Sequence, residues 1–96
     1  MMAQSLEDVI SGIVKARFAD AEIEDITYES DFDSDGDPIL RITVVFASEL
    51  AAVDPHKLAG LVRHVRPSLN ERREARFPIF RFVSKRDNDR MRHEAA

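Results

Sequence analysis

The densest group of side chains that could do chemistry is the acidic segment Asp31-Phe-Asp33-Ser-Asp35-Gly36. Its alternating carboxylates and following glycine match the spacing of the first half of a calcium-binding loop, in which such oxygens converge on one hard cation. The twelfth position of that loop requires a bidentate glutamate, but here it is Ile42, inside a run of β-forming residues. We therefore interpret residues 31–37 as an acidic turn, with weak calcium binding at Asp31–Asp35 as the minor alternative.

Other residue types used in catalysis do not occur in workable combinations. The chain has no cysteine, and its histidines are His56, His64 and His93. His56 and His64 are eight residues apart, which is too far along one helix for both to bind the same ion. The serines lack a Gly-x-Ser-x-Gly setting, and three scattered glycines do not form a phosphate-binding loop. We expect a non-enzymatic protein that binds no metal and no cofactor.

Charge is divided unevenly along the 96 residues, whose net charge is −4. Residues 1–54 carry 13 acidic and three basic side chains, a balance of −10, whereas residues 55–96 carry five acidic and 11 basic ones, a balance of +6. Such asymmetry can mark a surface that binds nucleic acid or another charged partner. The favoured interpretation is that the acidic and basic elements lie side by side in the folded domain and neutralise each other. The N-terminus lacks the basic region of a secretory signal, and no apolar run reaches the roughly 20 residues of a membrane span. These features favour a soluble, cytoplasmic protein without a membrane partner.

Hydrophobic spacing predicts a single small domain of the α+β class, at residues 1–86. The capping pair Ser5 and Asp8 opens a helix over residues 5–19, and strands at 22–31 and 39–46 are joined by a turn at Asp35-Gly36. Asp54 opens a second helix, which we expect to be kinked or split at Pro67. A third strand covers 77–84. Residues 87–96 show no apolar periodicity and are expected to be disordered.

The resulting α-β-β-α-β order places both helices on one face of a three-stranded sheet. The other face then has no helix to cover it, although it carries apolar as well as charged residues. Such a face is a candidate interface, and the alternative is that its β-branched residues face solvent and were selected for their strand propensity. We accordingly predict a small accessory or interaction protein that binds a protein partner, or itself, through this open face, while the acidic hairpin steers a basic partner. The predicted partner-binding residues are Ile39, Arg41, Val45, Ile79, Arg81 and Val83.

The basic side chains around the second helix and third strand support an alternative, an RNA-binding module. Arginines near phenylalanines can hold and stack single-stranded nucleic acid. The element order from Leu6 to Lys85 is also similar to that of the type II KH family, whose resemblance implies RNA binding. That family's Gly-x-x-Gly loop should lie between the paired helices, where this chain has Val65-Arg66-Pro67-Ser68, so no RNA-contact residue is carried over. The residues of this alternative are Arg63, Arg66, Arg72, Arg73 and Arg76.

Overall fold

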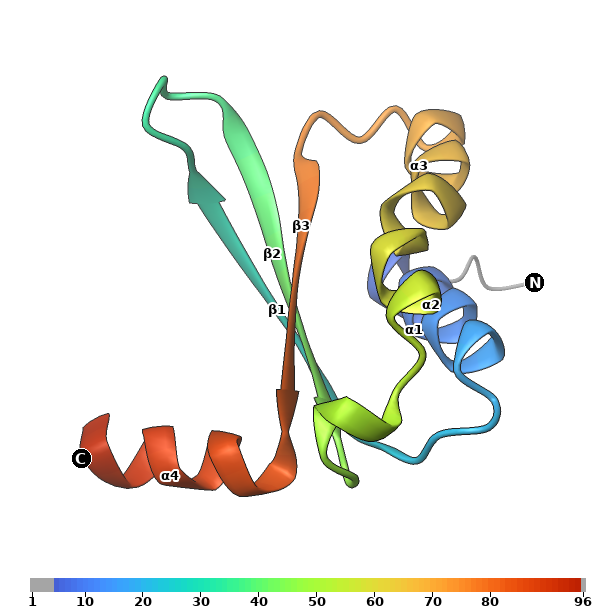
Figure 1. Ribbon diagram of the computed structural model, residues 1–96. Helices are drawn as coiled ribbons and strands as arrows, with labels where there is room; N and C mark the ends of the chain where they lie inside the picture. Colours follow the sequence, from blue (N-terminus) through green and yellow to red (C-terminus); the bar gives the residue numbers. More distant parts are fainter. Residues whose placement is uncertain (1–4, 96) are drawn as a thin grey trace.

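The computed structural model describes the backbone of residues 5–95 and the side chains of residues 5–90 (Figure 1). Three strands form one sheet, helices α1 to α3 form a layer on one of its faces, and α4 leaves the sheet on the other side. The predicted α+β class and the α-β-β-α-β order are confirmed. The elements are α1 (Leu6–Arg17), β1 (Ile23–Phe32), β2 (Pro38–Phe46), a 3-10 turn (Leu50–Ala52), α2 (Pro55–Ala59), α3 (Leu61–Glu71), β3 (Phe77–Ser84) and α4 (Lys85–Ala95).

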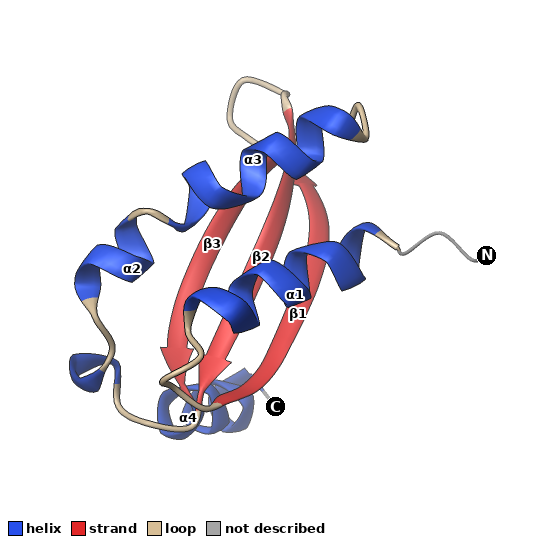
Figure 2. Cartoon of the chain, turned by 90° about the vertical axis from the view of Figure 1, so that its right-hand side faces the viewer, coloured by secondary structure: helices blue, strands red, loops and turns tan. Residues whose placement is uncertain are grey.

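The sheet is mixed, with strand order β1-β2-β3. β1 and β2 form an antiparallel hairpin, whereas β3 runs parallel to β2. A parallel neighbour needs a crossover connection, and α2 and α3 provide it on the face that α1 also covers (Figure 2). Because β2 and β3 start at the same end of the sheet, the connection from α3 to β3 returns to the end where the hairpin turns. We call this end the hairpin end.

Alternation along the strands assigns each side chain to one of the two faces. In β2, Leu40, Ile42, Val44 and Phe46 point into the core, where they meet the buried stripe of α1 and α3. An aromatic cluster closes the far end of this core, because the ring of Phe18 lies edge-on to Phe46 at 5.2 Å and to Phe82 at 6.3 Å. The core therefore lies between the helices and one face of the sheet.

The second predicted helix is divided, but not at Pro67. α2 ends at Ala59 and α3 begins at Leu61, whereas Pro67 lies inside α3. The break occurs at Gly60, and Arg17 stabilises it by donating hydrogen bonds to the carbonyl oxygens of Lys57 (2.7 Å) and His56 (3.1 Å). Both carbonyl groups lie at the end of α2, where that of His56 also accepts a hydrogen bond of 3.1 Å from the backbone N–H of Gly60. An arginine from α1 therefore adds hydrogen bonds at the point where the helix is interrupted. Of the two predicted alternatives at Pro67, a split is therefore wrong, because the helix is divided at Gly60 instead.

Residues 87–96 were expected to be disordered, but residues 85–95 form the helix α4, and residue 96 lies outside the described residues. The hydroxyl of the buried Ser84 accepts a hydrogen bond of 3.1 Å from the backbone N–H of Asp87, which caps the start of the helix. α4 packs against the ends of β2 and β3 and then extends away from the sheet, on the side opposite α1 to α3 (Figure 1). The helix α4 therefore bounds one end of the sheet face that is not covered by α1 to α3.

Candidate interaction surface

The face of the sheet opposite the helix layer is formed by alternate residues of all three strands. The strand pairing places Glu29, Arg41 and Ile79 side by side in one row. The next row toward α4 holds Thr27, Thr43 and Arg81. We call these six residues the open face. Its centre is polar and charged, and Ile79 is its exposed hydrophobic side chain, with 39% of its surface accessible.

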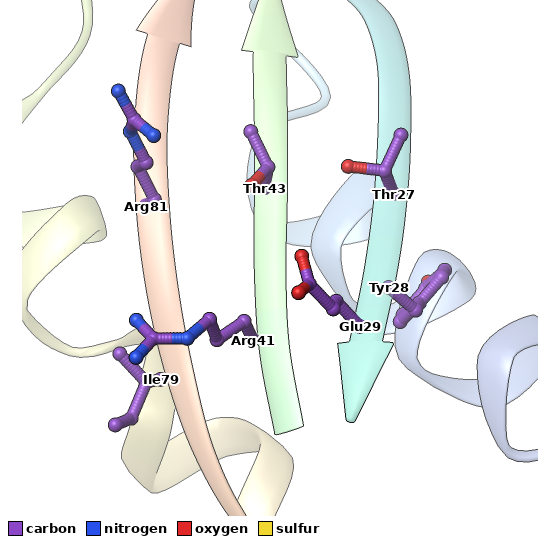
Figure 3. A pocket seen from close by; sticks show the side chains of 7 residues that line it. All are labelled: Thr27, Tyr28, Glu29, Arg41, Thr43, Ile79 and Arg81. Carbon is purple, nitrogen blue, oxygen red and sulfur yellow. The ribbon is translucent and has the colours of Figure 1, made fainter. Parts of the chain in front are cut away.

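These residues line a pocket of about 220 Å³ (Figure 3). The side chains of Arg41 and Ile79 lie next to each other over β3, and Glu29 points from β1 toward the centre of the face. Arg41 is oriented by Asp31, whose carboxylate accepts a hydrogen bond of 2.9 Å from Arg41 Nε. The backbone N–H of Phe32 and the guanidinium of Arg41 lower the pKa of Asp31 below its ordinary value, so this carboxylate is charged at neutral pH. The pocket therefore offers cationic, anionic, hydroxyl and apolar groups within a small area.

Only half of the predicted partner-binding set is available on this surface. Arg41, Ile79 and Arg81 are exposed there, but Ile39, Val45 and Val83 are buried, with at most 7% of their surface accessible. Val45 and Val83 form the last row before α4, and α4 packs against this end of the face. Ile39 lies on the central strand between Asp31 and Phe77. The alternation assigned all six residues to the correct face, but the expectation that nothing covers this face is wrong at the end where α4 packs.

The acidic hairpin uses its carboxylates differently from a calcium loop. Asp31 is held by Arg41, and Asp33 accepts hydrogen bonds of 2.9 Å from the backbone N–H groups of Asp35 and Asp37, which stabilise the turn. The carboxylates that come together, within 4.8 Å of one another, are those of Asp33, Asp35 and Asp37, and all three are exposed. The turn at Gly36 has the positive φ of 85° that favours glycine. The predicted acidic turn is thus observed, with its charge directed to solvent.

The five predicted nucleic-acid-binding arginines lie on α3 and the connection that follows it. Arg76 is the exception among them in having an ionic partner, because its guanidinium donates to Glu74 at 2.7 Å. Glu74 accepts this hydrogen bond and a second one from the backbone N–H of Arg76, and together they lower the pKa of Glu74 to about 2. Arg66 lies over the ring of Phe77, 5.3 Å from its centroid. Within the described side chains, Arg63, Arg66, Arg72 and Arg73 are exposed and form no ion pair.

Some parts of the surface were missed at the level of sequence. Thr27, Glu29 and Thr43 line the pocket, and the pairing register of β1 and β2 is the signal that would have identified them. The wall formed by α4 could have been found from Ser84 and Asp87, which have the spacing of a helix cap. Phe32 was not singled out, although 66% of its surface is exposed.

Comparison with models of known protein families found no match for this chain, and a search of curated proteins likewise found no significant similarity. Among the described residues, no helix is both long and apolar enough to cross a membrane. Functional argument therefore rests on the surface chemistry of the chain itself.

Proposed function

We propose that this chain is a non-enzymatic interaction protein that binds another protein through the open face. The observation that carries the proposal is a sheet face whose centre is left uncovered by the described chain, with Arg41, Ile79 and Arg81 around one pocket. Sheets in small domains normally bury one face and solvate the other with scattered polar residues. Here the arginines supply a residue type that is enriched in the binding centres of interfaces, and Ile79 adds an exposed apolar side chain beside them.

The shape of the surface supports a protein partner. The helix α4 lies at one end of the face, so that sheet and helix together form a corner (Figure 1). A corner of this kind suits a helix or loop of a second protein, which contacts both walls at once. The acidic hairpin adds long-range attraction for a basic partner, because charge complementarity raises the rate of association more than it raises affinity.

The test is retention of proteins from a nuclease-treated lysate of the source cells on the immobilised chain. Ile79→Glu introduces a charge at an already exposed position, so the fold is kept while binding should fall at least about tenfold. Arg63→Glu on α3 is the matched control for a charge change away from this face. We expect a protein that the wild type and the control retain and that Ile79→Glu loses. Equal retention by all three chains contradicts the proposal.

A second candidate function is RNA binding by the basic side of α3. The specific observation in its favour is a group of exposed arginines that form no ion pair with any described residue, namely Arg63, Arg66, Arg72 and Arg73. Arg66 also lies over the ring of Phe77. Guanidinium and aromatic faces stack on unpaired bases. Titration of a fluorescent single-stranded RNA tests it. Four phosphate contacts predict a slope of about −3 in log affinity against log salt concentration, and Arg66→Glu with Arg73→Glu should abolish binding.

A further inference from the structure

The hairpin end of the molecule brings the two most strongly charged parts of the sequence to the same end. The β1–β2 turn lies there with Asp33, Asp35 and Asp37, and the α3–β3 connection with Arg72 and Arg73 lies there as well (Figures 1 and 2). The strand order separates them sideways, because β1 and β3 are on opposite edges of β2. This end therefore has an acidic side and a basic side.

Each side also carries an exposed phenylalanine. Phe32 directly precedes Asp33 on the acidic side, and 66% of its surface is accessible. Phe77 begins β3 on the basic side, 47% exposed, with the guanidinium of Arg66 over its ring. Together with Ile79, these are the exposed large hydrophobic side chains in the described part of the chain. Exposed aromatic residues bordered by charge are typical of protein interfaces.

The charges at this end are not consumed within the molecule. No ion pair connects Asp33, Asp35 or Asp37 with another side chain of residues 5–90, and the same holds for Arg66, Arg72 and Arg73. The two sets lie at one end of a domain whose longest extent is only 35 Å, yet they remain available to a binding partner. A partner that suits both sides must present basic groups opposite the acidic side and acidic groups opposite the basic side.

We propose that a second copy of this chain is that partner, bound end to end about a two-fold axis at the hairpin end. A two-fold axis places the same patch of both subunits in contact, so the patch must be complementary to itself. It brings the acidic side and Phe32 of one copy onto the basic side and Phe77 of the other, twice in each dimer. This surface adjoins the open face at Phe77, which is two residues before Ile79 on β3, but it includes none of the six residues of the open face. The inference goes beyond the proposed function.

Two charge-reversed variants test the arrangement. The first is Asp35→Lys with Asp37→Lys, which keeps Asp33 and the backbone N–H groups that form the turn. The second is Arg66→Glu with Arg73→Glu. In each variant alone, both sides of the hairpin end carry charge of the same sign. Two copies of one variant should therefore repel each other and remain monomers. Mixed together they should form a heterodimer, because each acidic side then meets a basic one. Phe32→Ser, at an exposed position, should weaken the wild-type dimer at least tenfold.

Sedimentation velocity of the purified full chain provides the measurement, over about 10–500 µM, the range suited to a small interface that is partly polar. We expect the wild-type mass to rise from 10.9 kDa toward twice that value. A wild type that stays monomeric overturns the proposal, as does a mixture of the two variants that does not associate. If the wild type is monomeric while Arg66→Glu with Arg73→Glu loses RNA binding, the basic side binds nucleic acid instead. Retention of a protein by the open face is unaffected by these outcomes, so the two proposals fail separately.

Discussion

The contact between Gly60 and Arg17 allows a sharp test of how the helix layer is assembled. Gly60 is buried at the break between α2 and α3, and a Cβ placed on it would lie 2.5 Å from Arg17 Nη2. Its φ of −88° is accessible to alanine, so the backbone itself is not strained. We predict that Gly60→Ala lowers the free energy of unfolding because it displaces the guanidinium from the carbonyl oxygens at the end of α2.

The magnitude follows from the two hydrogen bonds of Arg17. Losing the one to His56 and weakening the one to Lys57 costs about 1.5 kcal/mol, since bonds from a charged donor to exposed or half-buried carbonyls are of this order. Alanine returns about 0.5 kcal/mol by restricting the unfolded chain. Gly60→Ala should therefore destabilise the wild type by about 1 kcal/mol. In an Arg17→Ala background, where nothing is displaced, it should stabilise by about 0.5 kcal/mol.

The measurement is urea unfolding of the wild type, the two single variants and the double variant. We expect a coupling free energy of about 1.5 kcal/mol between Gly60→Ala and Arg17→Ala. Gly12→Ala is the control. Apart from its chain neighbours and the backbone of α1 itself, no atom lies within 4 Å of the position where its Cβ would be. Gly12→Ala should therefore stabilise α1 by a similar amount in both backgrounds. If the effects of Gly60→Ala and Arg17→Ala are simply additive, the reasoning about the helix break is refuted.

Two further predictions concern Glu74 and Ser84. Because the pKa of Glu74 falls from 4.5 to about 2 on folding, its stabilising contribution is complete above pH 4.5 and is lost as the pH falls toward 2. Glu74→Gln should therefore lower the free energy of unfolding by about 1 kcal/mol at neutral pH, after allowance for solvent screening. It should also flatten the decline of that free energy between pH 4.5 and 2. An unchanged pH profile argues against a stabilising Glu74–Arg76 ion pair. Ser84→Ala removes the cap of α4, worth about 1 kcal/mol, so amide hydrogen exchange in α4 should become several-fold faster while α3 is unaffected. Exchange that accelerates equally in both helices would show instead that α4 unfolds only with the whole domain.

The architecture was predictable from sequence because the periodic patterns are strong. Ser5 caps the first helix as expected, through a hydrogen bond of 3.1 Å from the N–H of Asp8. In the same way, Asp54 accepts from the N–H of His56, next to a proline at the first helical position. Alternation in β2 and β3 also placed each residue on its correct face. Local chemistry of this kind is encoded within a few residues and needs no knowledge of distant contacts.

The errors arose where a distant residue decides the outcome. Proline lacks an N–H and disfavours the interior of a helix, which pointed to a break at Pro67. The actual break at Gly60 depends on Arg17, which lies more than 40 residues earlier and supplies the hydrogen bonds that make it stable. Similarly, the residues of α4 have no apolar stripe from which a helix could be predicted. The burial of Val45 and Val83 in turn depends on this helix, because α4 packs against the ends of β2 and β3.

Net charge is a poor guide to the surface of this protein. Its isoelectric point near 5.3 suggests a uniformly acidic surface. Because β3 runs parallel to β2, the basic connection after α3 must return to the end where the acidic hairpin turns, and the strand order keeps the two on opposite edges. The local charge therefore changes sign across one end of the molecule. A partner responds to this local field over about a Debye length, not to the total charge, so an acidic chain can present a basic surface as effectively as an acidic one.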